Sequence, residues 1–247
     1  MLKKCLSANQ IKLIAIAAMT ADHLAWALFP GTPAVWYVCA LHSIGRLAAP
    51  IMWFFIAEGC YHTSNARRYI GRLFLFALIS HFAYNFAFGI PYIPFKNGVI
   101  EQTSVMWGLT LAVASICICR EERVPLWFKV LSLIAACLLS FPADWSSVAV
   151  LCPFCLYACR GDFRKQAAVI VFWTLVYGAV NILFFNRLYG HLQLFMLFSI
   201  PILAMYSGER GKRAGMKRLF YLYYPLHLVV IGLIRIGLHG NLPVLPV

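Results

Sequence analysis

The chain has 247 residues, of which 62% are hydrophobic and 12% charged, and its mean hydropathy is +0.79. Soluble domains average about 45–50% apolar and about 25% charged residues, so this apolar excess is too large for one soluble core. The net charge of +13 would suit a nucleic-acid-binding protein, but the basic residues cluster between apolar runs. The composition therefore predicts an all-α polytopic membrane protein, a helical bundle forming a single domain over residues 1–247, with membrane lipid and no nucleic acid as partner.

About 20 apolar residues are needed for a helix to cross a bilayer. Nine runs qualify as candidate spans: residues 9–29, 42–61, 69–89, 103–119, 126–143, 145–159, 166–186, 190–207 and 218–238. The fifth and sixth are expected to form a tight hairpin around residues 141–145. The first run is followed by no small-residue cleavage site, so it is expected to remain as a span and not to be removed as a signal peptide.

Positive charge is concentrated in alternate loops. The basic residues of these loops are Lys3, Lys4, Lys12, Arg67, Arg68, Arg72, Arg120, Arg123, Arg160, Arg164, Lys165, Arg210, Lys212, Arg213, Lys217 and Arg218. The remaining loops carry only Lys96 and Arg187. Because cytoplasmic loops are enriched in Lys and Arg, this asymmetry predicts a cytoplasmic N-terminus. The same loops are candidates for attracting anionic lipid or a phosphorylated ligand.

Cysteine spacing offers one motif. Cys152 and Cys155 are separated as in metal or redox sites, but no second pair or histidine stands nearby. They also lie in an expected span, where a thiol acts as a small hydrophobe. A structural role is therefore predicted, and no metal is expected.

The second run, residues 41–63, carries charged groups in its middle. Arg46 and Glu58 would each cost at least about 2.5–3.5 kcal/mol in hydrocarbon, so they seldom lie there without a partner or a function. Polar and bulky residues recur there at every fourth position, namely His42, Arg46, Pro50, Phe54, Glu58 and His62. Each step drifts about 40° round a helix, so they form a slowly winding stripe, with a kink expected at Pro50. We interpret the first two runs as the walls of an intramembrane polar site.

Asp22 and His23 lie more than halfway through the first run. Neighbouring residues point about 100° apart on a helix, so the two need not bond to each other. An ion pair between Asp22 and Arg46 would offset much of the cost of burying either charge. Two interpretations remain open for His23: a structural core histidine, or a general base supported by Asp22 or Arg46. Imidazole suits the second role because its pKa is near neutral pH.

Other polar residues are weaker candidates. Three interpretations remain open for Glu58: a second acid or base, an ion-pair partner for a positive loop, or a residue at a helix end whose carboxylate reaches toward water. Tyr84 belongs to a polar group near the outer end of the third run, which suits either an interfacial belt or a site wall. The loop that follows, with Glu101, is a candidate for the mouth of a cavity.

The last run places His227 one turn after Tyr223 and Tyr224, with Pro225 between them. Proline would loosen the helix at this point. A histidine among tyrosines at a kink suits either a site wall or a helix-packing contact. His227 is therefore the candidate second site histidine, with Tyr221 and Tyr224 as hydrogen-bond donors.

Four stretches, in this order, are the most distinctive: IKLIAIAAMTADH, IGRLAAPIMWFFIAEG, RLFLFALISHFAYNFAF and LFYLYYPLHLVVIGLI. Together with residues 205–211, where Ser207 replaces an asparagine, they resemble the TraX family of conjugal-transfer membrane proteins. The resemblance runs from Ile11 to about Ile234. Its most specific parts are the Asp22-His23 pair, the pattern around Arg46 and Pro50, and the tail that contains His227.

The resemblance implies an inner-membrane bacterial acyltransferase that moves acetyl from acetyl-CoA to the N-terminal amine of a pilin. It implies that CoA approaches from the cytoplasm and the acceptor from the far side. Arg210, Lys212 and Arg213 would then face the CoA phosphates. His23 would be the general base, and Arg46 would balance charge or hold the thioester carbonyl.

Three alternatives stay open. The acceptor could be another surface polymer, such as a glycan, or a lipid. The protein could instead be a transporter or proton channel with Asp22, Arg46, Glu58 and His227 as a relay. It could also be a structural assembly protein in which Asp22 and Arg46 only hold the fold.

Overall fold

The computed structural model describes residues 4–31, 33–96, 98–211 and 216–244, without the side chains of residues 216–218. These residues form helices and two isolated bridges, with no strand among them, so the all-α prediction is confirmed. The elements are α1 (Ala8–Leu28), α2 (Trp36–Gly45), α3 (Ala48–His62), α4 (Ala66–Phe88), α5 (Val105–Arg120), α6 (Leu126–Ser140), α7 (Val148–Ala158), α8 (Phe163–Phe184), α9 (Arg187–Leu192), η1 (Gln193–Phe198), α10 (Ser199–Ala204) and α11 (Met216–His239).

Six segments are long and apolar enough to cross a membrane, which supports an integral membrane protein. They are Ala8–Leu28, Trp36–His62, Ala66–Phe88, Phe163–Phe184, Arg187–Ala204 and Leu219–His239. Three shorter apolar helices, α5, α6 and α7, complete the set. Each of the nine expected runs corresponds to one of these segments, whereas the number that cross a bilayer and the side of the N-terminus remain predictions.

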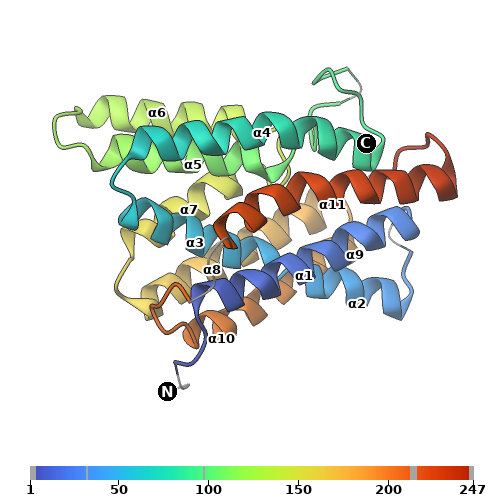
Figure 1. The fold of residues 1–247 in the computed structure, drawn as a ribbon, viewed down its shortest axis with the longest axis horizontal. Coiled ribbons are helices and arrows are strands. Elements are labelled where there is room, and N and C mark those ends of the chain that lie inside the picture. The colour runs from blue at the N-terminus through green and yellow to red at the C-terminus, as the bar shows by residue number, and fades with distance from the viewer. Residues whose placement is uncertain (1–3, 32, 97, 212–215, 245–247) are drawn as a thin grey trace.

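The helices run along one long axis (Figure 1). The links α3–α4, α5–α6 and α7–α8 and the start of α1 lie toward one end, which we call the basic end because the Lys- and Arg-rich loops gather there. Residues 89–96 and 98–104 and the end of α11 lie at the opposite, far end. The charge alternation read from the sequence therefore corresponds to a separation in space.

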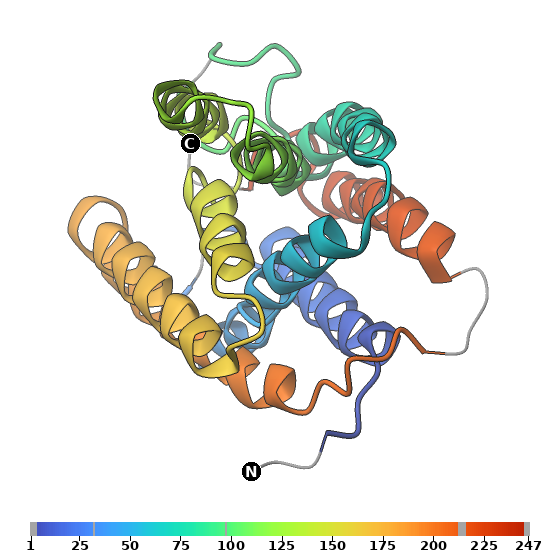
Figure 2. The same cartoon turned by 90° about the vertical axis from the view of Figure 1, so that its left-hand side faces the viewer.

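Helices α1 and α3 occupy the centre when the bundle is viewed from its basic end (Figure 2). Helix α1 packs on α2, α3 and α11, and α3 packs on α5 and α7. The face of α1 toward its neighbours includes Ala15, Ala18 and Ala25, which are almost fully buried. Small residues let helix backbones approach closely inside a membrane, where water provides no hydrophobic drive. Trp53 and Ile51 of α3 fill the adjoining core.

The stripe of the second run is interrupted. Helix α2 ends at Gly45 and α3 begins at Ala48, so Arg46 lies at the C-terminal cap of α2. Pro50 has no N–H to donate to the carbonyl of Arg46, four residues earlier, and this explains the break. The kink expected at Pro50 is thus a two-residue turn that separates Arg46 from Glu58.

Two loops meet at the far side of the core. Helices α6 and α7 are joined by residues 141–147, which confirms the expected hairpin. The Asp144 N–H donates to the Thr103 carbonyl at 2.9 Å, and the Gln102 N–H to the Pro142 carbonyl at 2.7 Å. These bonds tie the hairpin to the segment that carries Glu101.

Candidate functional site

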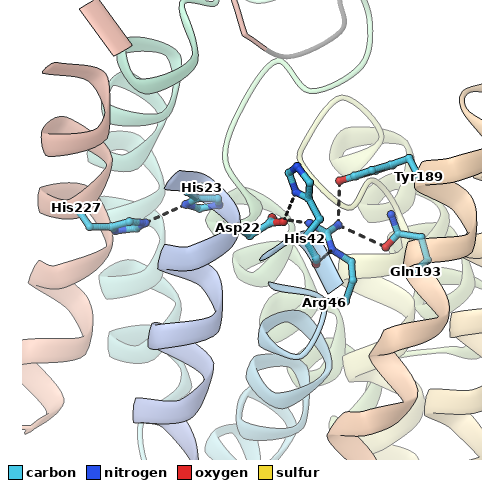
Figure 3. Close-up of polar contacts among 7 residues, drawn as sticks. All are labelled: Asp22, His23, His42, Arg46, Tyr189, Gln193 and His227. Atoms are coloured by element: carbon cyan, nitrogen blue, oxygen red, sulfur yellow. Dashed lines mark hydrogen bonds and ion pairs between the residues drawn. The ribbon is translucent and has the colours of Figure 1, made fainter. Parts of the chain in front are cut away.

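Asp22 of α1 is the centre of a buried ion cluster (Figure 3). His42 Nδ1 donates to its Oδ1 at 2.8 Å, and the Arg46 guanidinium pairs with its Oδ2. Arg46 Nη1 also donates to the Tyr189 hydroxyl at 2.9 Å and to Gln193 Oε1 at 3.4 Å. The Asp22–Arg46 contact predicted from the sequence is therefore present, and it compensates both buried charges.

Three members of this cluster were not proposed as site residues from the sequence. His42 belongs to the stripe of polar and bulky residues in the second run, and its spacing of four from Arg46 could have indicated that both side chains face one partner. Tyr189 and Gln193 come from α9 and η1, far along the chain, and no sequence pattern pointed to them.

His23 turns the other way, toward α11 (Figure 3). Its Nδ1 lies 2.9 Å from Nε2 of His227, and His227 Nδ1 lies 3.0 Å from the Tyr223 carbonyl. A carbonyl can only accept, so neutral His227 carries its proton on Nδ1 and accepts at Nε2. His23 must then donate from Nδ1, which leaves the Nε2 lone pair of His23 free to take a proton.

This geometry corrects part of one expectation. Asp22 was expected to orient His23 or to balance its charge; among the described residues the hydrogen-bond partners of Asp22 are His42 and Arg46, so it does not orient His23, whereas charge balance remains a prediction. His227 orients His23 instead. The physical reason is the 100° step between neighbours on α1, which sends Asp22 toward α2 and His23 toward α11.

Asp22, Arg46 and Tyr189 of the first cluster and His23 of the second border one cavity of about 80 Å³, here called the inner chamber, whereas His227 is not part of its described lining. Its polar lining consists of Asp22, His23, Arg46, Glu101, Asp144 and three tyrosines, Tyr84, Tyr189 and Tyr224. Apolar side chains such as Trp53 and Met52 form the rest of its wall. Of the predicted site residues, the structure therefore brings Asp22, His23, Arg46, Tyr84 and Tyr224 to one space.

A second cavity of about 550 Å³, the vestibule, lies at the basic end. It shares Met19, Met52, Met106, Leu109 and Tyr224 with the inner chamber, so the two adjoin. Its cations are Lys12, Arg72 and Arg210, and its rings include Phe55, Tyr69, Phe220 and Tyr221. The Lys12 ammonium lies 4.8 Å from the centre of the Phe55 ring. Such a wall can bind a ligand that combines anionic groups with a flat ring.

The remaining predicted residues have separate locations. Tyr221 lines the vestibule, where its hydroxyl accepts from Arg72 Nε at 3.2 Å, and Arg210 lies in the same wall. Lys212 and Arg213 fall outside the described residues. Tyr221 and Tyr224, proposed together as donors beside His227, therefore both line the vestibule, and Tyr224 also lines the inner chamber.

Glu58 has the partner that one of its three interpretations required. Arg160, in the α7–α8 link, approaches Glu58 Oε1 to 2.8 Å through Nε and donates from Nη2 to Oε2 at 3.2 Å. Glu58 thus pairs with a positive loop while it also borders the vestibule. The pair holds the ends of α3 and α7 together.

Glu101 and Asp144 bring two further carboxyls to the inner chamber from the far-end loops. Burial, followed by the negative charge of Asp144, raises the pKa of Glu101 to about 8. Burial likewise raises the pKa of Asp144 to about 7, although the positive charge of Arg46 acts in the opposite direction. Both groups therefore exchange protons near neutral pH. The sequence had indicated Glu101 only as part of a cavity mouth.

Comparison with known proteins shows the family of this chain. The TraX protein family matches residues 7–235. This chain belongs to the TraX family. The resemblance noted in the sequence is thus confirmed over nearly its whole length.

One relative of this TraX-family protein is the "Probable fimbrial assembly protein FimC, serogroup H1" of Dichelobacter nodosus. It is 28% identical over 235 residues, which cover 91% of this chain and 94% of the relative. No solved structure matches.

The two raised carboxyl pKa values predict a pH-dependent stability for the TraX-family protein. The folded state binds the protons of these two carboxyls more tightly than the unfolded chain does, because unfolded carboxyls titrate at about pH 4. Stability should therefore fall as the pH rises from about 4 toward about 8. In the double variant Glu101→Gln with Asp144→Asn, the thermal midpoint measured in detergent should depend less on pH over this range. Glu122→Gln, at an exposed position, should leave it as in the wild type; an unchanged slope in the double variant would contradict the prediction.

Proposed function

We propose that this TraX-family protein is a bacterial inner-membrane acetyltransferase. It would transfer acetyl from acetyl-CoA to the N-terminal amine of a pilin. One observation carries the proposal: a histidine with a free basic nitrogen borders the inner chamber, which adjoins a cationic, aromatic vestibule. The vestibule suits the donor, and the chamber suits the reacting groups.

The donor would occupy the vestibule. CoA combines phosphates with an adenine ring, and the wall offers Lys12, Arg72 and Arg210 for the phosphates and several rings for stacking. The acetyl thioester would then pass Met19, Met52 and Met106 to reach the inner chamber. Methionine suits such a passage because its side chain is unbranched and flexible.

The transfer requires a base and a fixed positive charge. The acceptor nitrogen attacks the thioester carbonyl carbon, forming the N–C bond, and the C–S bond breaks as the tetrahedral intermediate collapses. His23 Nε2 takes a proton from the attacking nitrogen and returns it to the departing sulfur, giving a free thiol. Arg46 stabilises the negative charge that develops on the carbonyl oxygen, and its position is fixed by Asp22, Tyr189 and Gln193.

The choice of a pilin as acceptor is supported by membership of the TraX family and by the name of the Dichelobacter relative, a probable fimbrial assembly protein. That name also supports a second candidate, a fimbrial assembly protein. In that case the Asp22 cluster would serve only to hold helices α1, α2 and α9 together.

Labelled acetyl transfer separates these functions. Membranes that contain the protein are incubated with labelled acetyl-CoA and a pilin, beside membranes that lack it. Label on the pilin N-terminus supports the proposal, and label on a lipid or glycan changes the acceptor. No label, together with no binding of acetyl-CoA, would favour the assembly function.

Lys12→Gln tests the vestibule directly. Lys12 lies over aromatic rings and has no acidic partner within ion-pair distance among the described residues. A lost contact to a phosphate should raise the KM for acetyl-CoA about tenfold, with little change in kcat. Arg187→Gln, an exposed change outside the vestibule, is the matched control and should leave KM unaltered. An unchanged KM in Lys12→Gln would remove Lys12 from the donor site.

A further inference from the structure

Glu101 and Asp144 are not used by the chemistry above, although both line the inner chamber. They arrive from the loops 89–104 and 141–147, which are joined by the backbone bonds at Thr103 and Pro142. The far-end loop 89–104 is visible opposite the basic end in Figure 1. Both carboxyls line the chamber and neither lines the donor vestibule.

The described lining of the chamber holds three carboxyls, Asp22, Glu101 and Asp144, and one arginine. Arg46 is the one arginine or lysine in its described lining, and it is paired with Asp22. Glu101 and Asp144 have no ion-pair partner among the described residues within 4.0 Å. Two carboxyls on a cavity wall without a cation of their own favour a ligand that brings positive charge, because that charge stabilises their ionised form.

The backbone beneath these carboxyls is held in a costly conformation. Glu101, Trp145 and Ser146 have φ values of 56°, 64° and 48°, a region that residues with a Cβ seldom adopt. Such conformations persist where surrounding structure enforces them, and they concentrate at functional sites. Here they occur at Glu101 and at the two residues that follow Asp144, of which Trp145 also lines the chamber.

A separate observation also points to a ligand. Trp53 lines the chamber and is 1% exposed, and its indole N–H has no acceptor among the described residues. An indole nitrogen can only donate, so a buried one without a partner calls for an acceptor atom. The carbonyl of a bound peptide or acyl group would supply it. The chamber thus offers carboxyls for a cation beside a donor for a carbonyl.

We propose that Glu101 and Asp144 are the acceptor-binding residues: they hold the ammonium group of the acceptor and take its first proton. This inference rests on the proposed acetyl transfer and assigns its acceptor half. One proton moves from the ammonium to a carboxylate, leaving a neutral amine whose lone pair attacks the acetyl carbon. His23 takes the second proton, as above, and passes it to the departing sulfur. The proton on the carboxyl is later released to water, so charge and atoms balance.

The first test measures binding without transfer. The full-length protein in lipid nanodiscs is titrated, at constant ionic strength, with trialanine amide and with its N-acetyl form. The wild type should bind the free-amine peptide about tenfold more tightly. Glu101→Gln and Asp144→Asn should each remove most of this preference, while acetyl-CoA binding stays at the wild-type level. Glu122→Gln, an exposed carboxyl-to-amide change, should keep the preference.

The second test uses a neutral nucleophile. Hydroxylamine is largely uncharged at neutral pH, so its acetylation should persist in Glu101→Gln and Asp144→Asn while the KM for the peptide rises about tenfold. Variants that keep the wild-type peptide preference, or that lose acetyl-CoA binding as well, would overturn the inference. A preference that depends on Glu101, found in a protein that transfers no acetyl, would refute the acetyltransferase proposal and leave the ammonium site standing.

Discussion

His23→Ala is expected to lower kcat for acetyl transfer by about 10²–10⁴-fold, the usual contribution of a positioned general base. The reason is geometric: His23 is the imidazole on the chamber wall whose Nε2 is left free when Nδ1 donates to His227. Binding of acetyl-CoA should be little affected, because His23 lies outside the vestibule wall. Steady-state kinetics in nanodiscs, with a separate binding titration, measure the two effects.

His227 gives the matched comparison. Because it acts through His23, His227→Ala should lower kcat less than His23→Ala and should change the pH profile of kcat by removing the acceptor that fixes the His23 tautomer. His191→Ala, on an exposed helix end, is the control and should resemble the wild type. Full activity in His23→Ala would exclude His23 as the base, whatever the effect of His227.

Arg46→Met is expected to destabilise the fold by about 3–5 kcal/mol, because it leaves Asp22 as a buried charge without its main partner. The retained bond from His42 offsets part of this cost, so the lower end of the range is expected. Reversible unfolding in detergent, or the shift of the thermal midpoint against wild type, measures the loss. A loss below about 1 kcal/mol, as for exposed pairs, would show that the pair is not buried in the way described.

The double variant Asp22→Asn with Arg46→Met separates folding from chemistry. Residues in direct contact are not additive, so the double variant should lose less stability than the two single variants together. If Arg46 also stabilises the reacting carbonyl, activity should remain low when stability is recovered. Recovery of activity together with stability would instead assign the pair to the fold alone, as in the assembly-protein alternative.

Most of the catalytic candidates could be predicted from the sequence, because polar side chains in apolar runs are rare and their burial in hydrocarbon costs free energy. Asp22, His23, Arg46 and His227 each lie in a run that is otherwise apolar, so each had to have a partner or a function. The all-helical fold followed from composition and run length in the same way. Helical spacing further indicated that Asp22 and His23 need not bond to each other, and Pro50 predicted a kink in the second run, which the structure places at residues 46–47.

The partners were decided only by the tertiary structure. His23 and His227 are 204 positions apart in the chain and meet because α1 packs against α11. Arg46 contacts Tyr189 because α9 packs against α2. No period in the sequence encodes how distant helices cross. Glu101 and Asp144 depend on loops with positive φ and on backbone bonds between them, which follow no regular pattern. Sequence thus determined which side chains needed partners, and helix packing decided which partners they have.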